Sequence, residues 1–230
     1  MKKILLASTS TLFGQSYLEY LLPELAGFFS HTGTITFIPY ARPGGISHED
    51  YTELVTTAFA KIDKRVVGLH SFGDPREGIA QAEALFTGGG NTFLLVQQLH
   101  NLDLMQPLKE KINEGTPYLG TSAGSNIAGP SMKTTNDMPI VHPPSFETLG
   151  VVGFNLNPHY LDPDPNSTHK GETRETRIRE FHQQDKTPVI GLREGDYILI
   201  HGQEATLKGV GTARIFEAGK SPYESRQIPF

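Results

Sequence analysis

The chain has 230 residues and a net charge of −5, and 37% of its residues are hydrophobic. This composition predicts a packed core, and the mildly acidic balance argues against a nucleic-acid partner. The absence of cysteine excludes disulfides, a thiol nucleophile and cysteine-bound zinc, and it fits a cytoplasmic protein. Because no apolar run has the length of a secretory or membrane-spanning segment, we expect neither.

Strands and helices alternate through the first half of the chain. Apolar runs predict buried strands over 4–7, 34–39, 65–69, 84–87 and 117–119. Helical spacing and capping residues predict helices over 15–26, 47–62, 75–82, 92–100 and 105–113. Repeated strand–helix units with short loops predict an α/β fold with a mostly parallel sheet flanked by helices. In such sheets, ligands bind beyond the carboxyl ends of the strands.

The second half is less regular. Residues 134–149 and 161–171 are rich in Pro, Asp, Asn and His and predict long loops, which in compact domains are usually functional. A strand over 155–158, a helix over 172–182, strands over 189–192 and 197–200 around a turn at Gly195, and a β-rich end over 206–216 are also predicted. Because no repeat, linker or low-complexity tract interrupts the chain, we expect residues 1–230 to form one domain.

The segment Gly-Thr-Ser-Ala-Gly at 120–124 stands between a predicted strand and a predicted helix. In that context G-x-S-x-G forms a nucleophile elbow, a tight turn that lifts the serine hydroxyl out of the sheet. A helix N-terminus beside Ser122 would favour negative charge there. The competing interpretation is a small-residue turn with no chemistry, since such pentapeptides are common.

A serine nucleophile needs a base, and the base needs an acid that orients it. His159, which follows Asn-Pro at a predicted strand end, is the candidate base, and His142 in a Pro-rich loop is a weaker competitor. Asp137 and Glu194 are the two candidate acids. Glu194 directly follows a predicted strand, whereas Asp137 could instead cap its own turn, and the sequence leaves the choice open.

Acyl transfer also needs two donors for the oxyanion. The N–H of Ala123, directly after the serine, is one candidate. Gly89 or Gly90, in the glycine run that ends the strand over 84–87, supplies the other, because glycine lets the backbone approach a substrate closely. The competing interpretation of this run is a simple turn or a mononucleotide-binding loop, although the run matches neither the Walker A motif nor G-x-G-x-x-G.

Five motifs together closely resemble the peptidase E group of the S51 serine peptidases, which are α-aspartyl dipeptidases. They are GGGNTF at 88–93, SAG at 122–124, TTNDMPI at 134–140, NPH at 157–159 and HKGETRE at 169–175. The resemblance runs from the first strand to Gly195. It implies a fold similar to the class I glutamine amidotransferases, with serine in place of cysteine. The chain departs from the pattern at His142, where an acidic residue is expected, and its tail after Thr206 is not diagnostic.

The resemblance implies that Ser122 is the nucleophile and His159 the base of a dipeptidase that cleaves Asp-Xaa, and both Asp137 and Glu194 match acids assigned to the triad. The substrate carboxylate calls for a cation, for which Arg174 is the first candidate and Lys170 the second; the competing role of Arg174 is an ordinary surface ion pair. Asn91 is assigned to substrate binding with them. We expect no metal or cofactor, and a loop over 160–171 that closes on the dipeptide.

Two other functions remain open at this stage. A related S51 hydrolase, such as a cyanophycinase-like peptidase, would share the serine and the glycine run. A non-enzymatic binding protein on the same scaffold would have the same fold but no catalytic activity. The expected partner is a small peptide, and the sequence leaves open whether the chain forms a homodimer.

Overall fold

A seven-stranded sheet forms the larger part of the computed structural model, which describes residues 1–166, 168 and 170–229. The strand order is β3-β2-β4-β5-β1-β8-β9. The strands are β1 (Lys3–Ala7), β2 (Thr34–Ile38), β3 (Arg65–Gly68), β4 (Leu85–Thr87), β5 (Tyr118–Thr121), β8 (Tyr197–His201) and β9 (Glu204–Lys208). The first five run parallel, and β8 and β9 are added antiparallel next to β1. The predicted mostly parallel α/β sheet is therefore confirmed.

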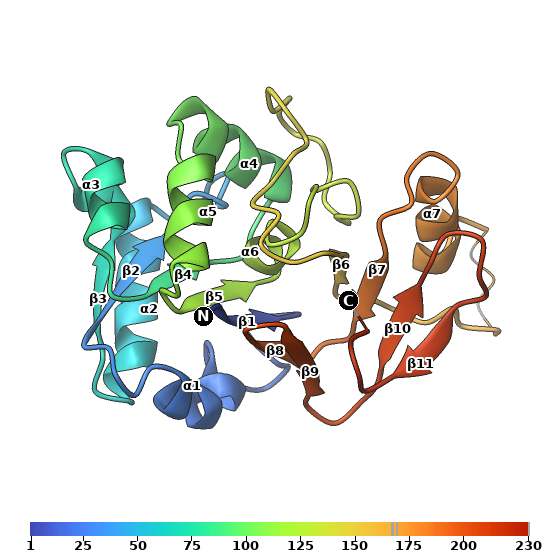
Figure 1. Cartoon of the computed structure of the whole chain (residues 1–230), viewed down its shortest axis with the longest axis horizontal. Helices are drawn as coiled ribbons and strands as arrows, with labels where there is room; N and C mark the ends of the chain where they lie inside the picture. Colours follow the sequence, from blue (N-terminus) through green and yellow to red (C-terminus); the bar gives the residue numbers. More distant parts are fainter. Residues whose placement is uncertain (167, 169, 230) are drawn as a thin grey trace.

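Helices cover both faces of this sheet (Figure 1). One face carries α1 (Leu22–Phe28) and α2 (His48–Ala60), and the other carries α3 (Pro75–Ala80), α4 (Thr92–Asn101), α5 (Met105–Asn113) and α6 (Ala123–Asn126). Side chains alternate between the faces along each strand. In β1, Leu5 packs with α1 and α2, whereas Ile4 and Leu6 pack on the opposite side. Burial on both faces explains why the strands read as continuous apolar runs.

A second sheet of four strands lies beside the first and is formed by the C-terminal part of the chain (Figure 1). Its order is β11-β10-β7-β6, with β6 (Asn155–Pro158), β7 (Val189–Leu192), β10 (Ala213–Phe216) and β11 (Tyr223–Ser225). Helix α7 (Arg174–Phe181) packs on it through Ile178. The turn at Gly195 therefore carries the chain from one sheet to the other, because β7 and β8 pair with different strands.

The helix predicted over 15–26 was placed too early. The structure has a short 3-10 helix at Glu19–Leu21 and then α1 at Leu22–Phe28, with Pro23 in its first turn. Proline is tolerated there because its missing N–H would have no helical partner anyway. A second 3-10 turn, at Leu69–Ser71, follows β3. Among the described residues no helix is both long and apolar enough to cross a membrane.

Four strand ends meet where the two sheets adjoin. Ala7 at the end of β1 pairs with Thr121 at the end of β5, and Pro158 at the end of β6 pairs with Leu192 at the end of β7. The hydroxyl of Ser8 links the two pairs by donating to the carbonyl of Leu192 at 2.8 Å. The residues that follow these ends are thus gathered in one place, as expected for parallel strands.

Candidate active site

Ser122 sits in a strained turn between β5 and α6. Its backbone has φ 53° and ψ −109°, a conformation that a residue with a side chain rarely adopts. The flanking glycines make the turn possible. A Cβ on Gly120 would lie 2.5 Å from the carbonyl oxygen of Gly124, and one on Gly124 would lie 2.1 Å from that of Thr87. The geometry of a nucleophile elbow is therefore present at the predicted serine.

His159 lies against the serine and against an acid. Its Nε2 is 2.9 Å from the Oγ of Ser122, and its Nδ1 is 2.7 Å from Oε1 of Glu194. The imidazole side chain is 36% exposed and the carboxylate 53%, so the group opens to solvent. With the Nδ1 proton directed to the carboxylate, Nε2 is free to accept from the hydroxyl. This is the arrangement in which a serine, a base and an orienting acid work together.

The backbone of His159 is held as firmly as its ring. It also has a positive φ, of 54°, and its N–H donates to the Oγ of Ser8 at 2.8 Å. Ser8 is fully buried, and its hydroxyl donates a hydrogen bond to the carbonyl of Leu192. Ser8 was not predicted as a site residue, because its one signal in the sequence is its place directly after the first strand.

Asp137, the other candidate acid, lies elsewhere. Its carboxylate accepts from the N–H and the hydroxyl of Thr92, at 2.7 Å and 2.6 Å, and from the hydroxyl of Thr135 at 3.1 Å. It therefore adds an acceptor at the N-terminus of α4, where negative charge is favoured. The contact with the imidazole belongs to Glu194, so Asp137 does not orient His159 in this structure.

The glycine run stands directly opposite Ser122. A Cβ on Gly89 would lie 3.1 Å from the Cβ of Ser122, so the two residues are neighbours. Gly90 has φ 146°, and a Cβ there would lie 2.2 Å from the carbonyl oxygen of Ala41. The backbone N–H groups of Gly89, Gly90 and Ala123 donate to no acceptor among the described residues. Within the described residues, all three predicted oxyanion donors are therefore unused.

The three predicted substrate-binding residues lie in different settings. Asn91 caps α4 by accepting from the N–H of Leu94 at 3.1 Å, and its amide donates to the carbonyl of Met138 at 2.9 Å. Arg174 begins α7 and is half-buried, and burial lowers the pKa of its guanidinium, with Arg177 lowering it further while Asp137 raises it. Lys170 is exposed.

The guanidinium of Arg174 has spare hydrogen-bonding capacity. Its Nε is buried without a partner among the described residues. The surface pair with Glu172 or Glu175 that the sequence allowed is not made: Glu172 lies against Arg177 at 3.8 Å, and Glu175 pairs with Arg179. A buried donor without an acceptor is costly unless a ligand supplies one.

In the described part of the chain, no hydrogen bond joins Ser122 to His142, the competing candidate base. His142 is exposed, and its carbonyl accepts from Gln97 at 3.2 Å, whereas the Oγ of Ser122 is bonded to His159. His169, the first residue of the motif at 169–175, lies outside the described residues.

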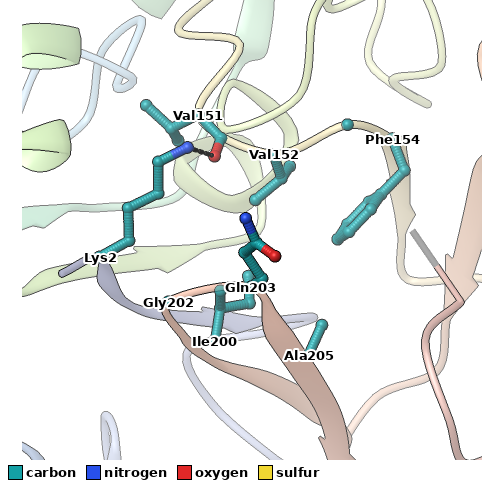
Figure 2. Close-up of a pocket in the computed structure, with 9 residues that line it drawn as sticks. Lys2, Val151, Val152, Phe154, Ile200, Gly202, Gln203 and Ala205 are labelled. Atoms are coloured by element: carbon teal, nitrogen blue, oxygen red, sulfur yellow. Dashed lines mark hydrogen bonds between the residues drawn. The ribbon is translucent and has the colours of Figure 1, made fainter.

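Two surface hollows differ in what they offer a ligand. One of about 430 Å³ is lined by Arg174 and Arg177 together with residues 161–164 and 171–173, within the segment that follows His159. The other, of about 360 Å³, lies at the amino end of β1 and β6, where Lys2 already donates to the carbonyl of Val151 at 2.8 Å (Figure 2). Of these two hollows, only the first offers a guanidinium whose Nε has no partner among the described residues.

Comparisons with known proteins find a family, named relatives and a similar fold. The model of peptidase family S51 matches residues 4–208. Peptidase E of Streptomyces coelicolor is 49% identical over 96% of this chain and 90% of its own length. A Drosophila melanogaster protein named "Probable alpha-aspartyl dipeptidase" is 44% identical over 94% of this chain and 90% of its own length. A solved structure of a peptidase from an acI-B1 Actinobacterium shares the fold, with a TM-score of 0.73 and 16% identity over 100% of this chain and 97% of that one.

Proposed function

The chain belongs to peptidase family S51, and from that membership we propose that it is a serine dipeptidase that hydrolyses dipeptides with an N-terminal aspartate. The observation that carries the chemistry is the run of contacts from Ser122 through His159 to Glu194, at 2.9 Å and 2.7 Å. The preference for aspartate is supported by the relatives named peptidase E and alpha-aspartyl dipeptidase and by the unpartnered donor on Arg174.

In the proposed acylation step, the Oγ of Ser122 attacks the scissile carbonyl carbon. His159 takes the hydroxyl proton on Nε2 and becomes an imidazolium, which the carboxylate of Glu194 stabilises. The carbonyl oxygen acquires the negative charge and accepts from the N–H groups of Ala123 and of Gly89 or Gly90. When the tetrahedral intermediate collapses, the C–N bond breaks and Nε2 returns the proton to the leaving amine.

Deacylation repeats these steps with water as the nucleophile. His159 takes a proton from the water, whose oxygen attacks the aspartyl ester on Ser122. The second tetrahedral intermediate expels the serine alkoxide, which regains its proton from the imidazolium. Free aspartate and the enzyme in its starting protonation state result, so neither a metal nor a cofactor is needed for balance.

For recognition, we propose that Arg174 binds the β-carboxylate of the substrate aspartate. A planar guanidinium offers parallel N–H donors to a carboxylate, which a neutral side chain in the same place does not satisfy. Burial lowers the pKa of Arg174 and the charge of Asp137 opposes part of this lowering, and a guanidinium stays protonated throughout. Lys170 stands on the same segment as a second cation, and Asn91 borders the glycine run. We also propose that the loop over 160–171, of which residues 167 and 169 lie outside the described part of the chain, closes over the bound dipeptide.

Ser122→Ala tests the proposed mechanism directly. We expect kcat for Asp-Leu to fall by about 10⁴-fold or more while circular dichroism and Tm stay those of the parent. Ser221→Ala, at an exposed serine far along the chain, is the matched control and should keep full activity. Turnover retained in Ser122→Ala would overturn the serine mechanism.

A panel of dipeptides with varied first residue tests the proposed selectivity. We expect Asp-Leu to be cleaved in preference to Asn-Leu, Glu-Leu and Ala-Leu, and Arg174→Ala to raise KM for Asp-Leu. A KM for Asp-Leu that Arg174→Ala leaves unchanged would refute the role of Arg174 without touching the serine mechanism. Cleavage of an aspartate-rich polymer in preference to dipeptides would instead favour a cyanophycinase-like enzyme.

A further inference from the structure

We propose that Tyr51 is a positioning residue that fixes the peptide between Gly89 and Gly90, so that the N–H of Gly90 faces the oxygen that becomes negative on the substrate. The proposal rests on the proposed function, since it concerns the same oxyanion site. It also chooses between the two glycines, which the sequence left open.

The contact behind this proposal is a buried hydrogen bond. Tyr51 lies on α2 and has no exposed surface, and its hydroxyl donates to the carbonyl oxygen of Gly89 at 3.1 Å. The ring is set at 87° to that of Phe37, with the centroids 4.9 Å apart. A fully buried, packed ring leaves the hydroxyl little freedom, so the carbonyl that it binds is held in one direction.

The direction of that carbonyl decides where the next N–H points. In a planar trans peptide the C=O of Gly89 and the N–H of Gly90 point in opposite directions. Tyr51 belongs to the core on the α1–α2 face of the sheet, whereas Ala123 of α6 belongs to the core on the opposite face. The N–H of Gly90 therefore points away from α2, toward the side on which Ser122 opens α6.

Neighbouring contacts keep the glycine run in place on both sides. The N–H of Asn91 donates to the carbonyl of Ala41 at 2.7 Å, which fixes the end of the run. At its start, a Cβ on Gly88 would lie 2.4 Å from the hydroxyl oxygen of Tyr51, so only glycine fits beside the tyrosine. The backbone of the glycine run, which lies next to Ser122, thus packs directly against the hydroxyl of Tyr51.

A second tyrosine supports the first without touching the glycine run. The hydroxyls of Tyr17 and Tyr51 are 3.3 Å apart. Because the proton of Tyr51 goes to Gly89, Tyr17 is the donor in this pair. Burial raises the pKa of Tyr17 well above its usual value, so it keeps the proton that it donates. Tyr17 therefore offers a matched control, since its removal leaves the bond to Gly89 intact.

Tyr51→Phe keeps the ring and removes only the hydroxyl. We expect kcat for Asp-Leu to fall by about tenfold, less than the 10²–10³-fold typical for complete loss of an oxyanion donor, because the N–H of Gly90 is loosened and not removed. KM and the pH dependence of kcat should stay those of the parent, because Arg174 and His159 are untouched. Tyr17→Phe should keep kcat within about twofold of the parent.

Active-site titration with a serine-reactive aspartyl phosphonate counts the competent molecules, so that kcat refers to folded enzyme even if Tyr51→Phe lowers stability. A kcat per titrated site equal to that of the parent would overturn the role of Tyr51. A fall in kcat accompanied by a shifted pH profile would also overturn it, because the damage would then lie at the imidazole. If the parent enzyme fails to react with the phosphonate and Ser122→Ala keeps its turnover, it is the proposed function that fails.

Discussion

Glu194→Gln removes the negative charge from His159 while keeping nearly the same shape. In the structure Oε1 of Glu194 lies 2.7 Å from Nδ1 of the imidazole. The charge matters most in the transition state, when the imidazole has taken the serine proton and is positive. Glutamine also introduces an N–H donor at this contact. When that N–H faces the ring, it favours the tautomer with its proton on Nε2, which is unable to accept from Ser122.

The size of the effect follows from the distance and the exposure. Two unit charges about 4 Å apart interact by about 4 kcal/mol at the effective dielectric constant of about 20 that suits a protein surface. The imidazole is 36% and the carboxylate 53% exposed, so solvent screens part of this attraction. We therefore expect Glu194→Gln to raise the activation free energy by about 2–3 kcal/mol, which corresponds to a fall in kcat of about 30- to 150-fold.

Steady-state kinetics with Asp-Leu and a comparison with Asp137→Asn provide the assay. We expect Glu194→Gln to lower kcat and leave KM nearly unchanged, since the charge acts on the transition state. Asp137→Asn should weaken the cap on Thr92 and change Tm and KM more than kcat. If Asp137→Asn lowers kcat by as much as Glu194→Gln, or if Glu194→Gln leaves kcat intact, the assignment of the orienting acid is wrong.

Two further outcomes test how the site is held. Ser8→Ala leaves the N–H of His159 without its acceptor, so we expect denaturant unfolding to show a loss of about 1–3 kcal/mol, together with a lower kcat at unchanged KM; a stability loss with normal kcat would contradict the link to His159. The guanidinium of Arg193 holds the pKa of Asp162 below its ordinary value. The ionised pair therefore contributes its full stabilisation at pH values above the pKa of Asp162 in the unfolded chain, which is about 3.9. This contribution is lost as the pH falls through the lower pKa of Asp162 in the folded protein. Asp162→Asn should therefore slightly lower Tm at about pH 6 and lower it less at about pH 2, and an equal Tm difference at both would contradict this reasoning.

The sequence predicted the first part of the site because its signals are local. The elbow at Ser122 depends on two glycines within two residues of it, and the strand before it is an apolar run. The element types and most of their bounds in the first half follow in the same way from periodicity and caps, as with Ser47, which accepts from the N–H of Asp50 at the start of α2. The early placement of α1 shows the limit, since apolar spacing extended the prediction ahead of Pro23.

The choice between Asp137 and Glu194 was open because it depends on how the two sheets meet. Its place after a predicted strand favoured Glu194, but a strand end does not by itself show which other strand end lies beside it. Glu194 reaches the imidazole because β6 and β7 pair in parallel, which places the ends of both strands together. That pairing belongs to the second sheet, and the strand pattern alone did not separate it from the first.

Residues that hold the backbone are harder to find than residues that do chemistry. Ser8 and Tyr51 are fully buried and carry no motif. The hydroxyl of Ser8 bonds to the main chain at His159 and at Leu192, and the hydroxyl of Tyr51 bonds to the main chain at Gly89. Tyr51 looks in the sequence like any aromatic residue on the apolar stripe of a helix. The structure adds what the sequence pattern does not show, which is the direction of its hydroxyl toward Gly89.

The end of β1 explains how two strained residues are kept facing each other. Ser122 and His159 both have a positive φ, which is unfavourable for residues with side chains and persists only where the surroundings impose it. The N–H of Ser122 donates to the carbonyl of Ala7 at 3.1 Å, and the N–H of His159 donates to the side chain of the next residue, Ser8, at 2.8 Å. One rigid central strand therefore sets the positions of both partners, although they are carried by different sheets. The distance between hydroxyl and imidazole is thus fixed by adjacent residues of β1 and the loop after it, and not by the long loops around the site.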